Sequence, residues 1–354
     1  MLDNILEIKK LDSGNMLGSL QLLGNQVEQI WNDAKKFKLP ANYGKINNVV
    51  VLGMGGSALG AHVIKSVFAK ELNVPVEIVN EYLLPKFVNN KSLVIASSYS
   101  GSTEESVFAV QEAKKRKAKI VVISAGGKLA ELAKKNKWPA LIFGTENNPC
   151  NSPRMGLGYS IAGQLIIFSQ VGLLKFKQKE LKNIVGIINK CDALFGLKNL
   201  AIKNLAKLLA ENTIDRGVII VGSEHLLGSA HILANQINEN AKRYSAYHAL
   251  PELNHHLLEG LMNPKNNVDN FVFVLLESSL YGKRNQKRYE VTKKVLAKQN
   301  IKFAVYNCQS KNKLSEAIEV LVFGSYVSYY SAILKNIDST PIPFVDYFKE
   351  QMSK

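Results

Sequence analysis

The sequence is poor in cysteine, and its three cysteines, Cys150, Cys191 and Cys308, lie far apart. An odd number at such spacing argues against a disulfide framework and against a thiolate metal cluster. The sequence also lacks an apolar run that approaches the roughly 20 residues needed to span a bilayer, and its first residues lack the pattern of a secretion signal. We therefore expect no contact with a membrane and a cytoplasmic protein.

Low-complexity segments are absent as well, and the composition is that of an ordinary globular protein, with 46% hydrophobic and 21% charged residues. A chain of 354 residues exceeds one typical core, so we expect two domains. The net charge is +16, but the lysines lie in helix-like runs such as EAKKRKAK, without interleaved aromatic residues. This pattern favours a solvated basic surface, and we predict no nucleic-acid partner.

Short apolar runs alternate with helical patterns along most of the chain, which is typical of parallel sheets covered by helices on both faces. The pattern predicts strands at 47–53, 74–79, 92–98, 119–125, 140–143, 217–223, 270–279 and 302–307. It predicts helices at 15–37, 57–72, from 103, and at 128–136, 156–172, 179–194, 198–212, 285–299, 313–335 and 344–352. We therefore predict an α/β protein with an N-terminal helical segment (1–44), a first domain (45–175) and a second domain (176–354).

One segment of the chain repeats. VVVLGMGGSALGAHVI (49–64) and VIIVGSEHLLGSAHIL (218–233) align without a gap at an offset of 169 residues, so that His62 matches His231. Matching strand–turn–helix units indicate two related doubly wound domains in tandem. The repeated histidines suggest helix packing rather than chemistry.

The first copy contains the glycine-rich loop GMGGSALG (53–60). Glycines after a strand let backbone amides approach a ligand, and the following helix start favours an anion. Gly53, Gly55 and Ala58 also fit a weak dinucleotide fingerprint, but the first suitable acidic residue, Glu81, lies 28 residues beyond Gly53, where about 20 is usual. The second copy has lost this glycine pattern, so we expect an anion site in the first domain.

Hydroxyl groups gather where another predicted strand meets a helix, in VIASSYSGSTEES (94–106). Ser98, Ser100 and Thr103 fall at the strand end, and Gly101 permits a tight turn. Hydroxyls and amides at a helix start can bind a phosphate without a basic residue. A helix cap formed by Ser102 or Thr103 is the alternative, but a cap needs one hydroxyl and five lie within seven residues. The pattern favours a phosphate site beyond the ends of neighbouring strands.

With these two loops, the later motifs PRMGLGY, NENAK, PELNHH and VDYFKEQ resemble the bifunctional phosphoglucose/phosphomannose isomerases of the sugar isomerase (SIS) superfamily, from about residue 45 to the end. The resemblance implies two tandem SIS domains and isomerisation of glucose 6-phosphate, and mannose 6-phosphate, to fructose 6-phosphate. It also implies a homodimer with the active site at the domain and subunit interface, and no metal or other cofactor. An aminosugar or heptose phosphate isomerase is the nearest alternative.

The resemblance also assigns roles to individual residues. It implies that Arg154 stabilises the enediolate, Glu239 is the catalytic base, His255 opens the sugar ring and Lys349 assists it. The phosphate-binding positions that it implies are Gly55, Gly56, Ser57, Ser98, Ser100 and Thr103. Two departures affect the surroundings of the ring-opening histidine, because His256 and Leu257 replace the family's Asn and Glu; Ser102 also replaces a common Asn.

The helical pattern alone leaves two orientations open for Glu239, because this residue lies off the apolar stripe and faces either a cleft or solvent. His255 and His256 diverge by about 100° on a helix, so we do not expect them to bind one metal together. Arg154 follows a glycine- and proline-rich stretch, which favours a binding loop at least as much as a surface ion pair. A non-catalytic sugar-phosphate sensor and a nicotinamide-dependent dehydrogenase remain alternative functions; the sensor would not need Glu239, Arg154 and His255 together.

Overall fold

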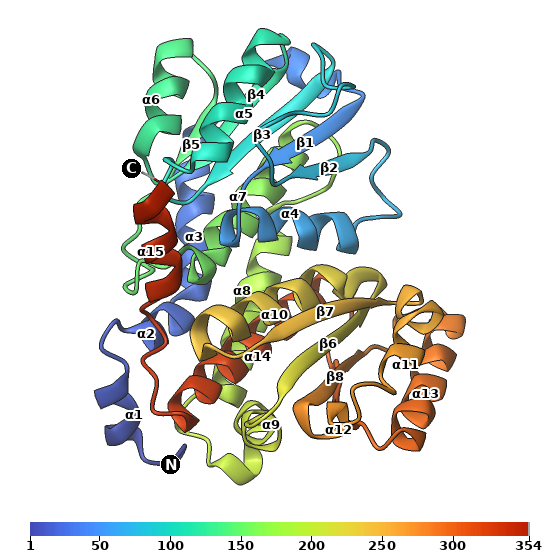
Figure 1. Ribbon diagram of the computed structural model, residues 1–354. Helices are drawn as coiled ribbons and strands as arrows, with labels where there is room; N and C mark the ends of the chain where they lie inside the picture. Colours follow the sequence, from blue (N-terminus) through green and yellow to red (C-terminus); the bar gives the residue numbers. More distant parts are fainter. Residues whose placement is uncertain (353–354) are drawn as a thin grey trace.

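The computed structural model describes residues 1–352 and contains two parallel β-sheets, one above the other in Figure 1. The first sheet has the order β2-β1-β3-β4-β5 and consists of β1 (Asn48–Leu52), β2 (Val76–Val79), β3 (Ser92–Ser98), β4 (Lys119–Ser124) and β5 (Ala140–Ile142). The second has the order β7-β6-β8-β9 and consists of β6 (Gly217–Ser223), β7 (Ser245–Leu250), β8 (Phe271–Glu277) and β9 (Lys302–Asn307). The predicted α/β class with two parallel sheets is confirmed.

The helices flank both sheets. Those of the first half are α1 (Ile5–Leu11), α2 (Met16–Gln21), α3 (Leu23–Asp33), α4 (Gly56–Val67), α5 (Glu104–Lys115), α6 (Gly127–Asn136) and α7 (Leu157–Gln170). Those of the second half are α8 (Gln178–Phe195), α9 (Leu205–Thr213), α10 (Leu227–Ala241), α11 (Leu257–Gly260), α12 (Asn267–Asn270), α13 (Lys283–Lys298), α14 (Lys313–Leu334) and α15 (Pro343–Met352). Three short 3-10 helices matter below, namely η3 (Pro153–Met155), η5 (Glu224–Leu226) and η6 (Glu252–His255).

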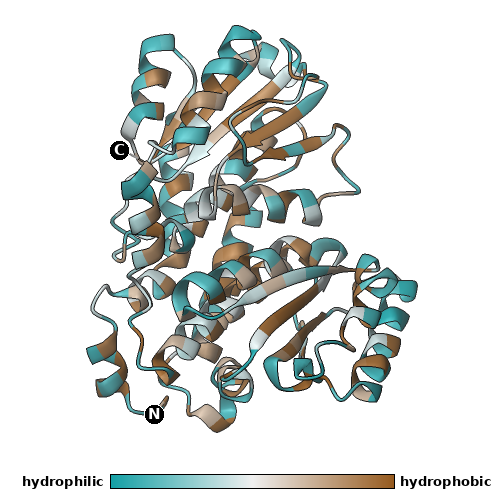
Figure 2. Ribbon diagram, in the orientation of Figure 1, coloured by the Kyte–Doolittle hydropathy of each residue, from teal (hydrophilic) through white to brown (hydrophobic). Residues whose placement is uncertain are grey.

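The central strands are apolar because both of their faces are covered. All five residues of β1 and all seven of β3 are buried, as expected for strands of a parallel sheet between two helical layers. Figure 2 shows the same distribution, with hydrophobic strands inside and hydrophilic outer faces on α5, α6 and α13.

The two halves repeat one another in space as well as in sequence. The order β2-β1-β3-β4 of the first sheet matches β7-β6-β8-β9 of the second, and the equivalent helices α4 and α10 pack together between the sheets. The rings of the equivalent residues His62 and His231 lie 4.5 Å apart, at an 80° angle. Contact between equivalent residues indicates an approximate twofold relation between the domains, and the predicted packing role of these histidines fits it.

Some elements differ from the predicted pattern. The single helix expected at 15–37 is broken at Leu22 into α2 and α3, and α1 precedes them. The edge strand β7 was not predicted. Helix α14 is long and apolar enough to cross a membrane, although no such segment was expected, but 94% of its apolar window is buried inside the protein. It is therefore the core helix of the second domain, packed against α8, α9 and α10.

Candidate active site

The two predicted binding loops lie side by side, because β1 and β3 are neighbours in the sheet. The backbone N–H of Tyr99 donates to Ser57 Oγ at 2.9 Å, and Ser97 Oγ donates to the Ser57 carbonyl at 2.8 Å. These bonds join the start of α4 directly to the end of β3. The structure thus brings the glycine loop and the hydroxyl loop to one place at the carboxyl edge of the sheet.

The hydroxyl loop leaves the start of α5 open. Thr103 is the N-cap residue, but its side chain makes no capping bond; its Oγ1 instead lies 2.8 Å from Ser98 Oγ, which accepts from the Gly101 N–H at 3.1 Å. Ser100 Oγ accepts from the Ser102 N–H at 3.3 Å. The structure therefore does not support the alternative that Thr103 caps the helix. First-turn N–H groups without a side-chain cap, ringed by hydroxyls, suit an anion.

The glycine loop brings a third segment to the same place. Gly55 has φ +47°, and a Cβ there would face open space. At Gly56 a Cβ would lie 2.6 Å from the carbonyl carbon and oxygen of Pro153 and 2.8 Å from the Arg154 nitrogen. Glycine at position 56 is thus what allows η3 to approach the loop, and η3 carries Arg154.

Arg154 is almost completely buried, with 2% of its surface exposed. Its Nε donates to Asn240 Oδ1 at 2.5 Å, and its Nη1 lies 3.4 Å from Glu239 Oε2. Its Nη2 donates to the carbonyls of Ser339 and Thr340 at 3.0 and 2.9 Å. Four partners therefore hold the guanidinium in place, and it does not form a surface ion pair. Burial lowers the pKa of Arg154, and the negative charge of Glu239 opposes that change.

Glu239 lies near the end of α10 with 32% of its side chain exposed. Burial raises the pKa of this carboxyl, and the positive charges of Arg154, Lys349 and Lys242 oppose the rise. The structure therefore resolves the choice left open by the helical pattern, because Glu239 faces a cluster of cations. A partly desolvated carboxylate with a raised pKa has the properties of a general base.

The C-terminal segment completes this cluster. Helix α15 (red in Figure 1) lies at the side of the molecule where the first sheet's strands end. Its Lys349 is close enough for its positive charge to lower the pKa of Glu239. Lys242 Nζ donates to the carbonyls of Asn240, Asp338 and Ser339 at 3.3, 3.1 and 2.8 Å. Burial lowers the pKa of Lys242 to about 8. Asn240 and Lys242 both lie in the predicted NENAK motif but were not singled out as functional residues.

His255 is not brought to this cluster within one chain. It is exposed in η6, after the end of β7, whereas Glu239 lies before the start of β7. Six strand residues at about 3.3 Å each separate the two ends by roughly 20 Å. The structure therefore brings nine of the ten predicted site residues to one region. His255 lies beyond the carboxyl end of β7, away from Glu239.

Comparison with known proteins identifies two SIS domains along the chain. A model described as "SIS domain" matches residues 43–138, and one described as "Bacterial phospho-glucose isomerase C-terminal SIS domain" matches residues 202–352. The fold is similar to the solved C-terminal domain of glucosamine-fructose-6-phosphate aminotransferase from Francisella tularensis, with a TM-score of 0.65, 16% identity, and coverage of 92% of this chain and 98% of that one.

Several relatives have the same name, and two of them are similar to this chain over nearly its whole length. The bifunctional phosphoglucose/phosphomannose isomerase of Caldicellulosiruptor bescii is 31% identical over 345 residues, which cover 96% of this chain and 99% of the relative. The protein of that name from Aquifex aeolicus is 30% identical, over 93% of this chain and 96% of the relative. The chain therefore belongs to the bifunctional phosphoglucose/phosphomannose isomerase family.

Proposed function

We propose that this chain interconverts glucose 6-phosphate and mannose 6-phosphate with fructose 6-phosphate through an enediolate. The observation that carries the proposal is the pairing of Glu239 with the buried Arg154 beside the two phosphate-type loops. Isomerisation of an aldose to a ketose moves one proton between adjacent carbons. It requires a base for that proton and a cation for the oxyanion that develops.

The residues divide the work as follows. The loops at Gly55–Ser57 and Ser98–Thr103 hold the phosphate through N–H groups and hydroxyls. Ionised Glu239 removes the proton from C2 of the open-chain aldose and returns it to C1, which contributes about 10²–10⁴-fold. Arg154 stabilises the enediolate oxygen, and groups of this kind contribute about 10²–10³-fold.

Ring opening is assigned to His255 with assistance from Lys349. Because His255 lies far from Glu239 in its own chain, the proposal includes a homodimer with the active site near the subunit interface, where the partner subunit's His255 reaches the sugar. A cytoplasmic location and a role in glycolysis or gluconeogenesis belong to the same proposal.

A coupled assay of the purified protein with glucose 6-phosphate and with mannose 6-phosphate tests this function. We expect turnover of both sugars with and without a chelator. Glu239→Gln should retain substrate binding and lose about 10²–10⁴-fold in kcat, because the amide cannot accept the proton. Glu211→Gln, on the exposed face of α9, is the matched control and should behave like the wild type.

The same assay separates the alternatives. Full activity of Glu239→Gln would show that the base is misassigned, and loss of activity with chelator would contradict a metal-free mechanism. Binding of the sugar phosphates without turnover would favour a non-catalytic sensor.

A further inference from the structure

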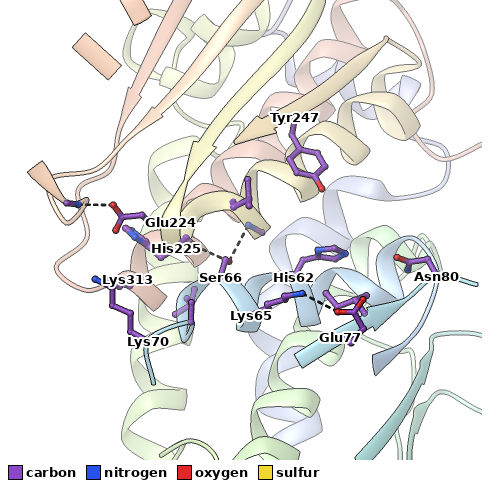
Figure 3. Close-up of a pocket in the computed structure, with 16 residues that line it drawn as sticks. His62, Lys65, Ser66, Lys70, Glu77, Asn80, Glu224, His225, Tyr247 and Lys313 are labelled. Carbon is purple, nitrogen blue, oxygen red and sulfur yellow. Dashed lines mark hydrogen bonds and ion pairs between the residues drawn. The ribbon is translucent and has the colours of Figure 1, made fainter. Parts of the chain in front are cut away.

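A large cavity lies away from the candidate active site. It has a volume of about 640 Å³ and lies between the domains. Residues at the end of α4 line one side, and residues of the loops that follow β6 and β8 line the other. We call it the second cleft; Figure 3 shows Lys70, Lys313, Glu224 and His225 around it. The activity proposed above uses none of these residues.

The approximate twofold relation makes this cavity the counterpart of the active-site cleft. At the offset of 169 residues, Gly55 corresponds to Glu224 and Glu239 corresponds to Lys70. The loop after β6 and the loop after β8 flank the second cleft as the loops after β1 and β3 flank the first. The second domain therefore places the same two loops around a cavity of its own.

The positive φ angle of the glycine loop is kept in the second domain although the glycine is not. Glu224 has φ +44°, close to the +47° of Gly55. A residue with a Cβ rarely adopts this φ unless the surroundings hold it there. At Glu224 the side chain does so, because Oε1 accepts from the Gly282 N–H and from Asn285 Nδ2, each at 2.8 Å.

Gly282 is the N-cap residue of α13, and no side chain of its own caps that helix. Helix α13 follows β8 as α5 follows β3, so its first turn is the counterpart of the open helix start at Thr103. The Glu224 carboxylate thus occupies the place where the first domain presents free N–H groups to an anion.

The rest of the second cleft also suits an anion. Among residues 1–352 neither Lys70 nor Lys313 forms an ion pair, and both residues line the cavity. His225, 1% exposed, lines it too; its Nε2 contacts Glu316 at 2.6 Å, while its Nδ1 has no partner in that part of the chain.

We propose that the second cleft is a latent phosphate site in which the Glu224 carboxylate takes the place of the phosphate. The native chain accordingly binds phosphate at the first cradle and not at the second. The ligand class that the opened site accepts is inorganic phosphate or a small phosphate monoester. The proposal rests on the proposed function for identifying the first cradle as a phosphate site. The expected gain of one site does not depend on that function.

Isothermal titration of the full-length protein with inorganic phosphate, supported by ³¹P NMR, tests the idea. We expect Glu224→Gly to bind one more phosphate per chain than the wild type, since glycine keeps the backbone conformation and frees the Gly282 N–H. Adding Lys70→Met should weaken binding at the new site several-fold. Glu224→Gln, whose amide oxygen still accepts from Gly282, should gain no site.

Glu77→Gln is the matched control, because Glu77 lies in β2, lines the same cavity and pairs with Lys65 at 3.7 Å. An equal number of sites in wild type and Glu224→Gly would overturn the proposal, as would a new site in Glu77→Gln. If wild type binds none and Glu224→Gly binds one, the first cradle is wrong and the latent site stands. Circular dichroism and retained isomerase activity report that each variant is folded.

Discussion

At the scale of single residues, the candidate site depends on one close backbone contact. Gly56 lies against the Pro153 carbonyl group, and this contact sets the distance between the phosphate loops and Arg154. The proposed binding loop and the proposed catalytic cation are thus coupled through a position that itself carries no functional group. A glycine here is required by close packing, whereas Gly55 is required by its positive φ.

The first prediction follows from this contact. Gly56→Ala places a methyl group 2.6 Å from backbone atoms of Pro153 that cannot rotate away. We expect η3 to shift, the stability to fall by about 1–3 kcal/mol, and kcat to fall by about 10²-fold because Arg154 is misplaced. Thermal unfolding and the coupled assay measure the two effects.

The control for this change is Gly186→Ala. Gly186 lies inside α8 with open space around its Cβ direction, so alanine should stabilise the protein by about 0.5–1 kcal/mol and leave activity unchanged. Wild-type kinetics in Gly56→Ala would show that the approach of η3 does not position Arg154.

At the scale of elements, a short connection decides where α15 lies. The segment 338–340 between α14 and α15 presents its carbonyls to two cations, Arg154 and Lys242. Large apolar side chains on α15 are exposed, Phe344 at 88% and Phe348 at 62%, so the helix has little packing of its own within the chain. The two cations therefore do much of the positioning of Lys349 near Glu239.

Lys242→Met removes one of these two clamps and one positive charge near Glu239. A base must be ionised, so activity falls as pH drops through its pKa. Burial raises the pKa of Glu239 and Lys242 opposes that rise, so losing Lys242 raises the pKa further. We expect the acidic limb of the kcat profile to move to higher pH, and kcat to fall more than KM rises.

Lys335→Met is the control for this change, because Lys335 lies at the end of α14 and pairs with Asp215 outside the cluster. Its pH profile should match that of the wild type. An unchanged acidic limb in Lys242→Met would mean that this lysine does not act on the Glu239 carboxyl.

The elements also show what the sequence could and could not predict. Strands such as β3 were predictable because every residue is buried and apolar or small. The strand β7 was not predicted because it lies at the edge of the sheet. Its sequence SAYHAL mixes polar and apolar residues, and most of them are only half-buried. The site motifs were found, but the carbonyls of Ser339 and Thr340 that bind Arg154 were not, since a backbone acceptor leaves no signature in the sequence.

At the scale of the whole molecule, the approximate twofold relation places the carboxyl ends of the strands of the two sheets on opposite sides. The first sheet's loops meet the end of α10, where Glu239 lies, while the second sheet's loops, with His255, face the other way. One chain therefore separates its proposed base from its proposed ring-opening group. Both can serve one sugar if two chains associate so that each supplies His255 to the other.

This arrangement predicts complementation between two inactive chains. In a mixed dimer of Glu239→Gln and His255→Asn, one site combines an intact Glu239 with the partner subunit's His255, and the other site lacks both. Random pairing makes half of the dimers mixed, with one of two sites intact, so co-expression should restore about a quarter of the wild-type rate. Two affinity tags allow the mixed dimer to be isolated, and that species should have about half of the wild-type activity. If the mixed dimer has no more activity than the two parents, His255 does not act across an interface, and the separation along β7 then leaves it without a role at this site.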